Sequence, residues 1–210
     1  MHRLDPRNKA VAISLAGLAG YVDALAFIEL KGFFVSFMSG NSTRMGVGIV
    51  GHRADWQTAF ALIVAFAAGV VLGSLLGRKI ERRRAAMLIA LIAALLAFAA
   101  TTISLNGPHA LAIALMALAM GAVNAVYEKD GEVKFGLTYM TGAIVKIGQH
   151  IAAFLAGEKV VGSISYALLW AGLVAGAALA AFTHPLWGLG GLWAASGFAL
   201  LLSAAMWREA

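Results

Sequence analysis

Two short polar motifs interrupt apolar stretches of this sequence at a spacing of 102 residues. The first is Met38-Ser39-Gly40 and the second is Met140-Thr141-Gly142, so that 140 − 38 = 102. A basic residue follows each motif, Arg44 in the first and Lys146 in the second. Hydroxyl groups, amides beside a glycine and basic side chains together can bind small anionic or polar solutes. The candidate binding residues are Ser39, Gly40, Asn41, Ser42, Arg44, Thr141, Gly142 and Lys146.

A second matching pair of segments lies upstream of the motifs. Gly20-Tyr21-Val22-Asp23-Ala24 aligns with Gly121-Ala122-Val123-Asn124-Ala125 at an offset of 101. Asp23 is the predicted charge partner of Arg44, whereas neutral Asn124 leaves Lys146 without a matched carboxylate. The resulting surplus of positive charge favours an anionic solute. Two interpretations stay open for Arg44 and Lys146, which either contact the solute or reach the membrane surface and form structural pairs.

The sequence offers little support for catalytic or metal chemistry. It contains no cysteine, which excludes disulfides, thiolate metal sites and cysteine nucleophiles. Its histidines are dispersed, and Ser39 and Thr141 have no histidine near them in sequence. We therefore expect no enzyme activity, no metal and no cofactor.

The composition is that of a membrane protein. Hydrophobic residues make up 61% and charged residues 12% of the chain, and the mean hydropathy is +0.86. Soluble domains have roughly 45–50% apolar and about 25% charged residues. The bilayer is thus an expected partner, and the net charge of +6 is assigned to cytoplasmic loops and not to nucleic-acid binding.

The motifs must be positioned by long apolar helices within a single membrane domain over residues 1–210. Two stretches, Phe33 to Val50 and Phe135 to Ala156, are poor spans because polar and basic residues interrupt them. Six other stretches are long enough to cross a bilayer. They run from Ala10 to Ile28, Asp55 to Gly77, Ala85 to Leu105, His109 to Tyr127, Ser165 to Phe182 and Trp187 to Trp207.

The distribution of basic residues predicts the topology. Eight crossings would place the Arg78 to Arg84 cluster outside, against the positive-inside rule. If each motif stretch instead enters and leaves the membrane on the same side, only Lys31 and Arg53 lie outside. Both termini are then cytoplasmic. The loops at Asn106 to His109 and Thr183 to Pro185, which have no Lys or Arg, also lie outside. Three crossings per half make the halves inverted, with the first repeat over residues 10–105 and the second over 109–207.

The motif stretches are predicted to be an extended segment followed by a half-helix. Phe33 to Phe37 and Phe135 to Tyr139 favour strand, and Ser39 and Thr141 are suitable helix N-caps. Inversion would point the N-termini of both half-helices at the membrane midplane. The expected fold class is therefore an all-α polytopic membrane protein with about six spans, two re-entrant strand/half-helix segments and a 3+3 inverted repeat.

The motifs resemble the YoaK-like family of bacterial inner-membrane proteins, long classed as a domain of unknown function. The resemblance is carried by Gly20 to Ala24, Phe34 to Ser42, Val123 to Ala125 and Thr138 to Gly142, and it extends over nearly the whole chain. It implies a six-span inner-membrane protein of transporter type, without a substrate. The connection from Tyr127 to Glu132 departs from the basic, glycine-rich stretch that we expect in the family.

The sequence thus predicts a carrier or channel for a small anionic or polar solute, with a central site between the two half-helix N-termini. One alternative is a proton- or cation-coupled carrier using Asp23, because an intramembrane carboxylate is a functional candidate. Another is a non-transporting structural membrane protein. A homodimer is also possible.

Overall fold

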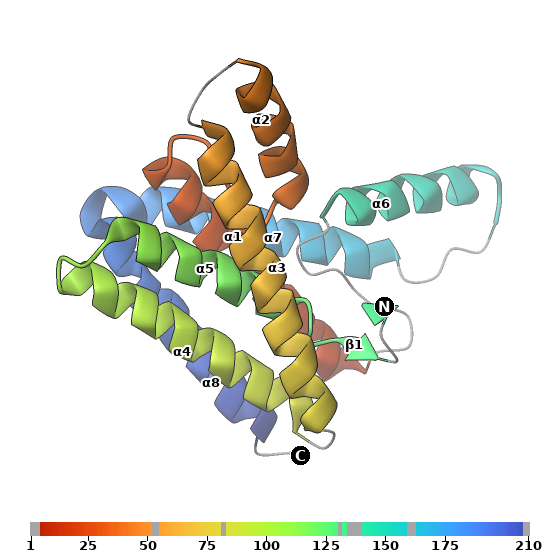
Figure 1. Cartoon of the computed structure of the whole chain (residues 1–210). Coiled ribbons are helices and arrows are strands. Elements are labelled where there is room, and N and C mark those ends of the chain that lie inside the picture. Colours follow the sequence, from red (N-terminus) through yellow and green to blue (C-terminus); the bar gives the residue numbers. More distant parts are fainter. Residues whose placement is uncertain are drawn as a thin grey trace.

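A computed structural model describes residues 5–51, 55–80, 83–129, 132–133, 140–158 and 163–207, and all structural statements refer to these residues. They form eight α-helices, one 3-10 helix and a hairpin of two-residue strands (Figure 1). The elements are α1 (Pro6–Glu29), α2 (Met38–Val50), α3 (Asp55–Lys79), α4 (Arg84–Ser104), α5 (His109–Val123), β1 (Glu128–Lys129), β2 (Glu132–Val133), α6 (Met140–Leu155), α7 (Ser163–Trp187), η1 (Gly188–Gly191) and α8 (Leu192–Trp207).

Four stretches are long and apolar enough to cross a membrane. They are α1, α3, α4 and the run Ile164–Trp207, which η1 divides into α7 and α8. The helices α5 and α6 are apolar but shorter, with 15 and 16 residues. The predicted all-α membrane architecture is confirmed, with the small β1–β2 hairpin as an addition.

The start of α1 follows from its local sequence. The side chain of Asp5 accepts a hydrogen bond from the backbone N–H of Asn8 at 2.8 Å, and Pro6 occupies the first turn, where no backbone donor is needed. The bond from Asn8 holds the pKa of the Asp5 carboxyl below its usual range. Asp5 thereby fixes where the first long helix begins.

Three predicted helix boundaries are wrong, including that of the helix predicted to begin at Trp187, which begins at Leu192. The helix predicted to reach Tyr127 ends at Val123, and the side chain of Arg84 donates to the carbonyl of Ala125 in the turn that follows. The loop predicted at Thr183 to Pro185 lies inside α7, which continues to Trp187. The chain breaks at Gly188 instead, whose φ of 49° suits glycine at a helix end.

Small residues let the long helices pack in close pairs. A Cβ on Gly20 of α1 would collide with the carbonyl oxygen of Leu173 on α7, and a Cβ on Gly69 of α3 would collide with that of Leu118 on α5. The third close pair is α4 with α8, where Ser196 donates to the carbonyl oxygen of Ala93 at 2.8 Å. Close backbone approach at small residues is the usual basis of helix packing in membranes.

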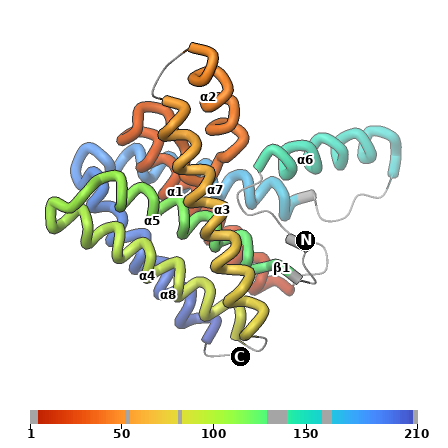
Figure 2. Tube along the Cα trace, in the orientation of Figure 1, coloured from red at the N-terminus to blue at the C-terminus, as the bar shows by residue number. Residues whose placement is uncertain are grey.

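The contacts at the helix ends define two ends of the bundle. At the first, the Arg7 side chain donates to the carbonyl of Ala205, and Arg83 lies over the ring of Trp207, 4.6 Å from its centroid. We call this the basic end, because it also carries Lys9, Arg78, Lys79 and Arg84. Figure 2 shows the described parts of α1 and α8 that reach it.

A carboxylate joins three helices at the other end, which we call the opposite end. The Glu29 carboxylate at the end of α1 lies 3.5 Å from Nδ1 of His109 on α5 and 3.7 Å from Nε2 of His184 on α7. The helices α1, α5 and α7 therefore each run between the two ends, and α1 runs from the basic end to the opposite end.

The β1–β2 hairpin lies beside the basic end, and its first residue is buried. Glu128 is buried, 3.3 Å from the Arg84 guanidinium and 2.5 Å from the Ser74 hydroxyl. The neighbouring Tyr127 hydroxyl donates to the carbonyl of Asn8 at 3.0 Å, and burial raises the pKa of Tyr127. The charged run Glu128-Lys129-Asp130-Gly131-Glu132 predicts a solvated hairpin, and this prediction is wrong for Glu128.

Candidate functional site: the re-entrant segments

The chain after α1 turns back towards the interior of the bundle. Lys31 and Gly32 have positive φ values of 52° and 107°, which reverse the chain direction at the opposite end. The following residues lie beside Asp23, six residues before the end of α1 and therefore about 9 Å along its axis. The N-terminus of α2 starts from this depth.

The Asp23 carboxylate holds the backbone of the returning segment. Its Oδ1 accepts hydrogen bonds from the backbone N–H groups of Val35 at 2.7 Å and Ser36 at 2.8 Å. Asp23 is partly buried, whereas Val35 and Ser36 are buried. Hydrogen bonds to an ionised acceptor are stronger than neutral ones, so this contact anchors the segment to α1.

Asn41 provides the second anchor. It is fully buried, accepts from the Phe34 backbone N–H at 3.1 Å and donates to the Phe34 carbonyl at 2.6 Å. The predicted strand over residues 33–37 is wrong, because these side chains take the backbone groups that a neighbouring strand would pair. The segment is an irregular backbone, in which Asp23 and Asn41 bond the N–H groups of Phe34, Val35 and Ser36 and the Phe34 carbonyl.

The motif residues on α2 have other roles than predicted. The helix begins at Met38 after the N-cap residue Phe37, so Ser39 is exposed and is not the N-cap. Ser42 donates to the carbonyl of Met38 at 2.8 Å, within its own helix. A Cβ on Gly40 would lie 2.5 Å from the Phe37 ring, so this glycine makes room for an aromatic side chain.

Arg44 does not pair with Asp23, and that sequence prediction is wrong. Its guanidinium donates to the carbonyl of Gly32, lies 4.0 Å from the centroid of the Phe33 ring and is 4.0 Å from Oδ2 of Asp55 at the start of α3. Asp23 and Arg44 thus lie in different contacts. Asp55 was missed by the sequence analysis, although its place at a helix start next to a basic stretch is a usable signal.

The second motif has more open surroundings. The helix α6 also begins at the motif methionine, Met140. Thr141, Gly142 and Lys146 are exposed, no atom lies within 4 Å of a Cβ placed on Gly142, and Lys146 bonds Gln149 at 3.0 Å. Figure 1 shows α6 reaching away from the rest of the helices. The predicted strand over residues 135–139 lies outside the described residues.

Asn124, the counterpart of Asp23, ends α5. It is buried and donates from Nδ2 to the carbonyl of Met120 at 3.2 Å, one turn earlier in the same helix. The predicted meeting of the two motifs has no support in the described side-chain contacts, since no hydrogen bond or ion pair joins them. The helix α2 packs against α3, and α6 packs against α7.

Over the described part of the chain, no group of three or more His, Asp or Glu residues is arranged to hold a metal ion. The strongest polar arrangement is therefore the Asp23 and Asn41 anchor, with Arg44 and Asp55 closer to the opposite end.

Comparison with known proteins places this sequence in a family. Residues 11–205 match the sequence profile described as Protein of unknown function (DUF1275). The chain is 36% identical over 200 residues to a UPF0700 transmembrane protein of Rhizobium meliloti (strain 1021), covering 95% of this chain and 86% of that protein. No solved structure matches the chain. These matches confirm the resemblance to the YoaK-like proteins and the membrane class.

Proposed function

The chain belongs to the DUF1275 family, and from this premise we propose that it is a transporter for a small polar solute, with the Asp23 segment at its centre. One observation carries the proposal: a carboxylate on a membrane-spanning helix holds irregular backbone about 9 Å from the helix end. Non-helical backbone at membrane depth is tolerated where it is buried in protein or lines a cavity. An ionisable side chain there is a functional candidate.

The proposed scaffold is a 3+3 inverted repeat with six spans, α1, α3, α4, α5, α7 and α8. Support comes from the recurrence of four helices in each half, α1 to α4 and α5 to α8, with a motif-bearing helix second in each. The glycine contacts of α1 with α7 and of α3 with α5 are also equivalent under exchange of the halves. Half-helices at equivalent positions of inverted repeats line transporter sites.

The proposed orientation follows from charge. The basic end carries Arg7, Lys9, Arg78, Lys79 and Arg84, whereas the opposite end has Lys31 and Arg44 among the described residues. The positive-inside rule then assigns the basic end, with both termini, to the cytoplasm of a bacterial inner membrane.

Asp23 is the proposed proton- or cation-coupling group. When ionised, it binds the two amides of Val35 and Ser36 strongly. Protonation of the carboxylate, or a cation bound to it, weakens that hold and frees the segment before α2. The charge state of one side chain is thereby linked to the conformation of the re-entrant segment.

A second candidate function is the transport of an anionic solute at the N-termini of α2 and α6. It is favoured by the uncovered backbone at Thr141 and Gly142 and by the exposed ammonium of Lys146. The proposed binding residues are those of the sequence motifs, including Ser39, Gly40, Asn41, Ser42 and Arg44. The candidate ranks second because Asp23 already binds the amides before α2 and Asp55 lies beside Arg44.

The test starts with thermal-shift screening of purified protein against small anions, nucleobases and small cations, since a specific ligand stabilises the folded state. The stabilising solute is then used for uptake into proteoliposomes at several pH values. We expect Asp23→Asn to remove the pH dependence of uptake and Asp5→Asn, a carboxylate at the start of α1, to retain it. An Asp23→Asn variant with wild-type pH dependence would refute the coupling role.

The same preparation separates the alternatives. Replacing Arg44 and Lys146 together by Gln should weaken binding of an anion, and unchanged affinity would exclude the second candidate. A melting temperature that no solute changes would favour a structural membrane protein. The homodimer stays a prediction, which native mass spectrometry of the protein can test.

A further inference from the structure

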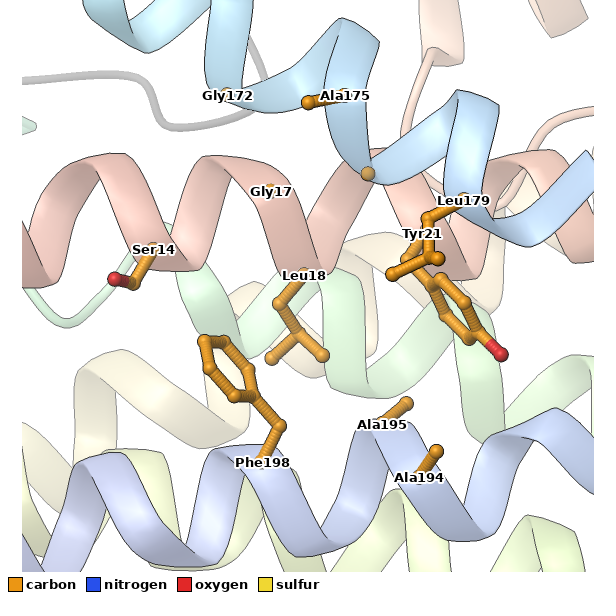
Figure 3. Close-up of a pocket in the computed structure, with 11 residues that line it drawn as sticks. Ser14, Gly17, Leu18, Tyr21, Gly172, Ala175, Leu179, Ala194, Ala195 and Phe198 are labelled. Atoms are coloured by element: carbon orange, nitrogen blue, oxygen red, sulfur yellow. The ribbon is translucent and has the colours of Figure 1, made fainter. Parts of the chain in front are cut away.

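A cleft of about 420 Å³ lies between α1, α7 and α8 (Figure 3). Its floor is the close α1–α7 pair, where a Cβ on Gly176 would collide with the carbonyl oxygen of Gly17. The helix α8 packs much less closely on α1 than α7 does. Figure 3 shows Leu18 and Phe198 directed into the space between α1 and α8. The helices that form the cleft therefore leave a gap of the size that small-molecule sites have.

The lining of the cleft is apolar. The hydroxyls are those of Ser14 and Tyr21, and the Tyr21 hydroxyl already lies 3.2 Å from the Thr183 hydroxyl. Among the described residues, none that lines the cleft is charged. An apolar cavity neither holds water well nor stabilises a polar solute. The occupant must therefore be a hydrocarbon group.

The cleft opens towards the bilayer. Leu179 and Phe198 at its rim are large apolar side chains with exposed fractions of 55% and 43%. Exposed apolar residues on membrane-spanning helices face lipid acyl chains. Ser14 lies seven residues after Arg7, about 10 Å along α1, so the basic end supplies a cation within reach of a lipid phosphate.

The gap is also encoded in the residue sizes, if the halves are the inverted repeat proposed above. The offset of 103 that aligns Gly69 with Gly172 and Gly73 with Gly176 also aligns Leu91 with Ala194 and Ile92 with Ala195 (194 − 91 = 103, 195 − 92 = 103). Ile92 is fully buried, and α4 packs far more extensively on α5 than α8 does on α1. Alanine in place of leucine or isoleucine leaves unfilled volume. The site between α4 and α5 is thus closed by side chains, and the equivalent site between α8 and α1 is open.

We propose that an acyl chain of a membrane phospholipid fills the α1–α7–α8 cleft, with its phosphate at the basic end. The lipid would complete the packing that leucine and isoleucine supply in the other half. A lipid in this cleft is compatible with any transported solute, so it can be tested without knowing one.

The test uses vesicles of phosphatidylethanolamine and phosphatidylglycerol that contain a phospholipid with a diazirine in the middle of an acyl chain. After illumination, we expect several-fold more labelling at Leu179 and Phe198, which line the cleft and are 55% and 43% exposed, than at Val64 and Val71, which are 49% and 57% exposed on α3. The variant Ala194→Leu/Ala195→Ile should lose the excess in the cleft and keep the labelling of α3.

Native mass spectrometry of the detergent-purified protein gives an independent readout. The wild type should retain one phospholipid that the filled variant has lost. If the double variant does not fold, Ser14→Leu narrows the cleft from α1 and should have the same effect. Equal labelling of cleft and α3, undiminished labelling in a folded filled variant, or retention of a non-lipid molecule or a second copy in the cleft would overturn the proposal.

Discussion

The two re-entrant segments share a motif but differ in what surrounds it. Before α2, the segment is held by Asp23 and Asn41, and Arg44 lies beside Asp55. The equivalent positions around α6 are Asn124 at an offset of 101 and Ala143 at an offset of 102. Ala143 has no polar group and cannot repeat the contacts of Asn41, and Asn124 carries a neutral amide where Asp23 carries a carboxylate, with its Nδ2 donating to the Met120 carbonyl.

This difference separates two kinds of information in the sequence. The motif lies at the N-terminal end of both short helices, because the described part of each starts with the motif methionine. Side chains outside the motif determine which contacts hold each helix to the bundle. A repeat of sequence therefore does not ensure a repeat of packing, and each half has to be tested separately.

The largest expected effect comes from removing the carboxylate anchor. Asp23→Ala leaves the amides of Val35 and Ser36 without an acceptor, and a hydrogen bond to a charged group contributes about 1.5–3 kcal/mol. We expect the free energy of unfolding to fall by roughly 3 kcal/mol or more, measured by thermal or denaturant unfolding in detergent. Asn124→Ala is the matched change in the other half and should cost less, because hydrogen bonds of a neutral amide are weaker than those of a carboxylate. Equal losses would contradict the difference between the segments.

Removing the second anchor should have a smaller effect. Asn41→Ala breaks two hydrogen bonds with Phe34 inside the protein and should lower the free energy of unfolding by about 2 kcal/mol. Ser42→Ala is the control, because Ser42 bonds only a carbonyl of its own exposed helix turn, and should change stability by less than about 0.5 kcal/mol. Similar unfolding curves for both variants would show that Asn41 is not an anchor.

Hydropathy and charge were enough to predict the class of the fold. Apolar runs near the length of a bilayer span gave α1, α3 and α4 nearly at their observed bounds. The return of the chain to the opposite end after α2 agrees with the positive-inside argument, which placed the Arg78 to Arg84 cluster with the N-terminus. These features depend on properties summed over many residues, which sequence shows directly.

The local contacts of the site could not be predicted in the same way. Arg44 has Asp55 and the Gly32 carbonyl as partners because of how the chain turns at Lys31 and Gly32. Sequence spacing suggested Asp23 instead, since an ion pair is the simplest expectation for opposite charges on neighbouring segments. Backbone amides also compete for a carboxylate, and they are invisible to an analysis of side-chain charge.

The basic residues of the two segments provide the next comparison. Arg44→Gln loses the contacts with the Phe33 ring and Asp55, and because Arg44 is one-third exposed the expected cost is only about 1 kcal/mol. Lys146→Gln loses one exposed hydrogen bond to Gln149 and should stay within about 0.5 kcal/mol of wild type. The melting temperatures of the two variants measure this difference in stability. A larger loss of stability for Lys146→Gln than for Arg44→Gln would mean that α6 has partners beyond those described.

The motif glycines give the smallest and most closely matched test. In Gly40→Ala the new Cβ meets the Phe37 ring, and the ring must shift. Up to about 1 kcal/mol of helix propensity offsets that clash, which leaves an expected net loss of about 0.5 kcal/mol. Gly142→Ala meets no atom of the described residues within 4 Å and keeps the gain. The two substitutions should therefore change the free energy of unfolding in opposite directions, which unfolding of both variants in the same detergent can measure. Changes of the same sign would mean that both glycines lie in equivalent environments.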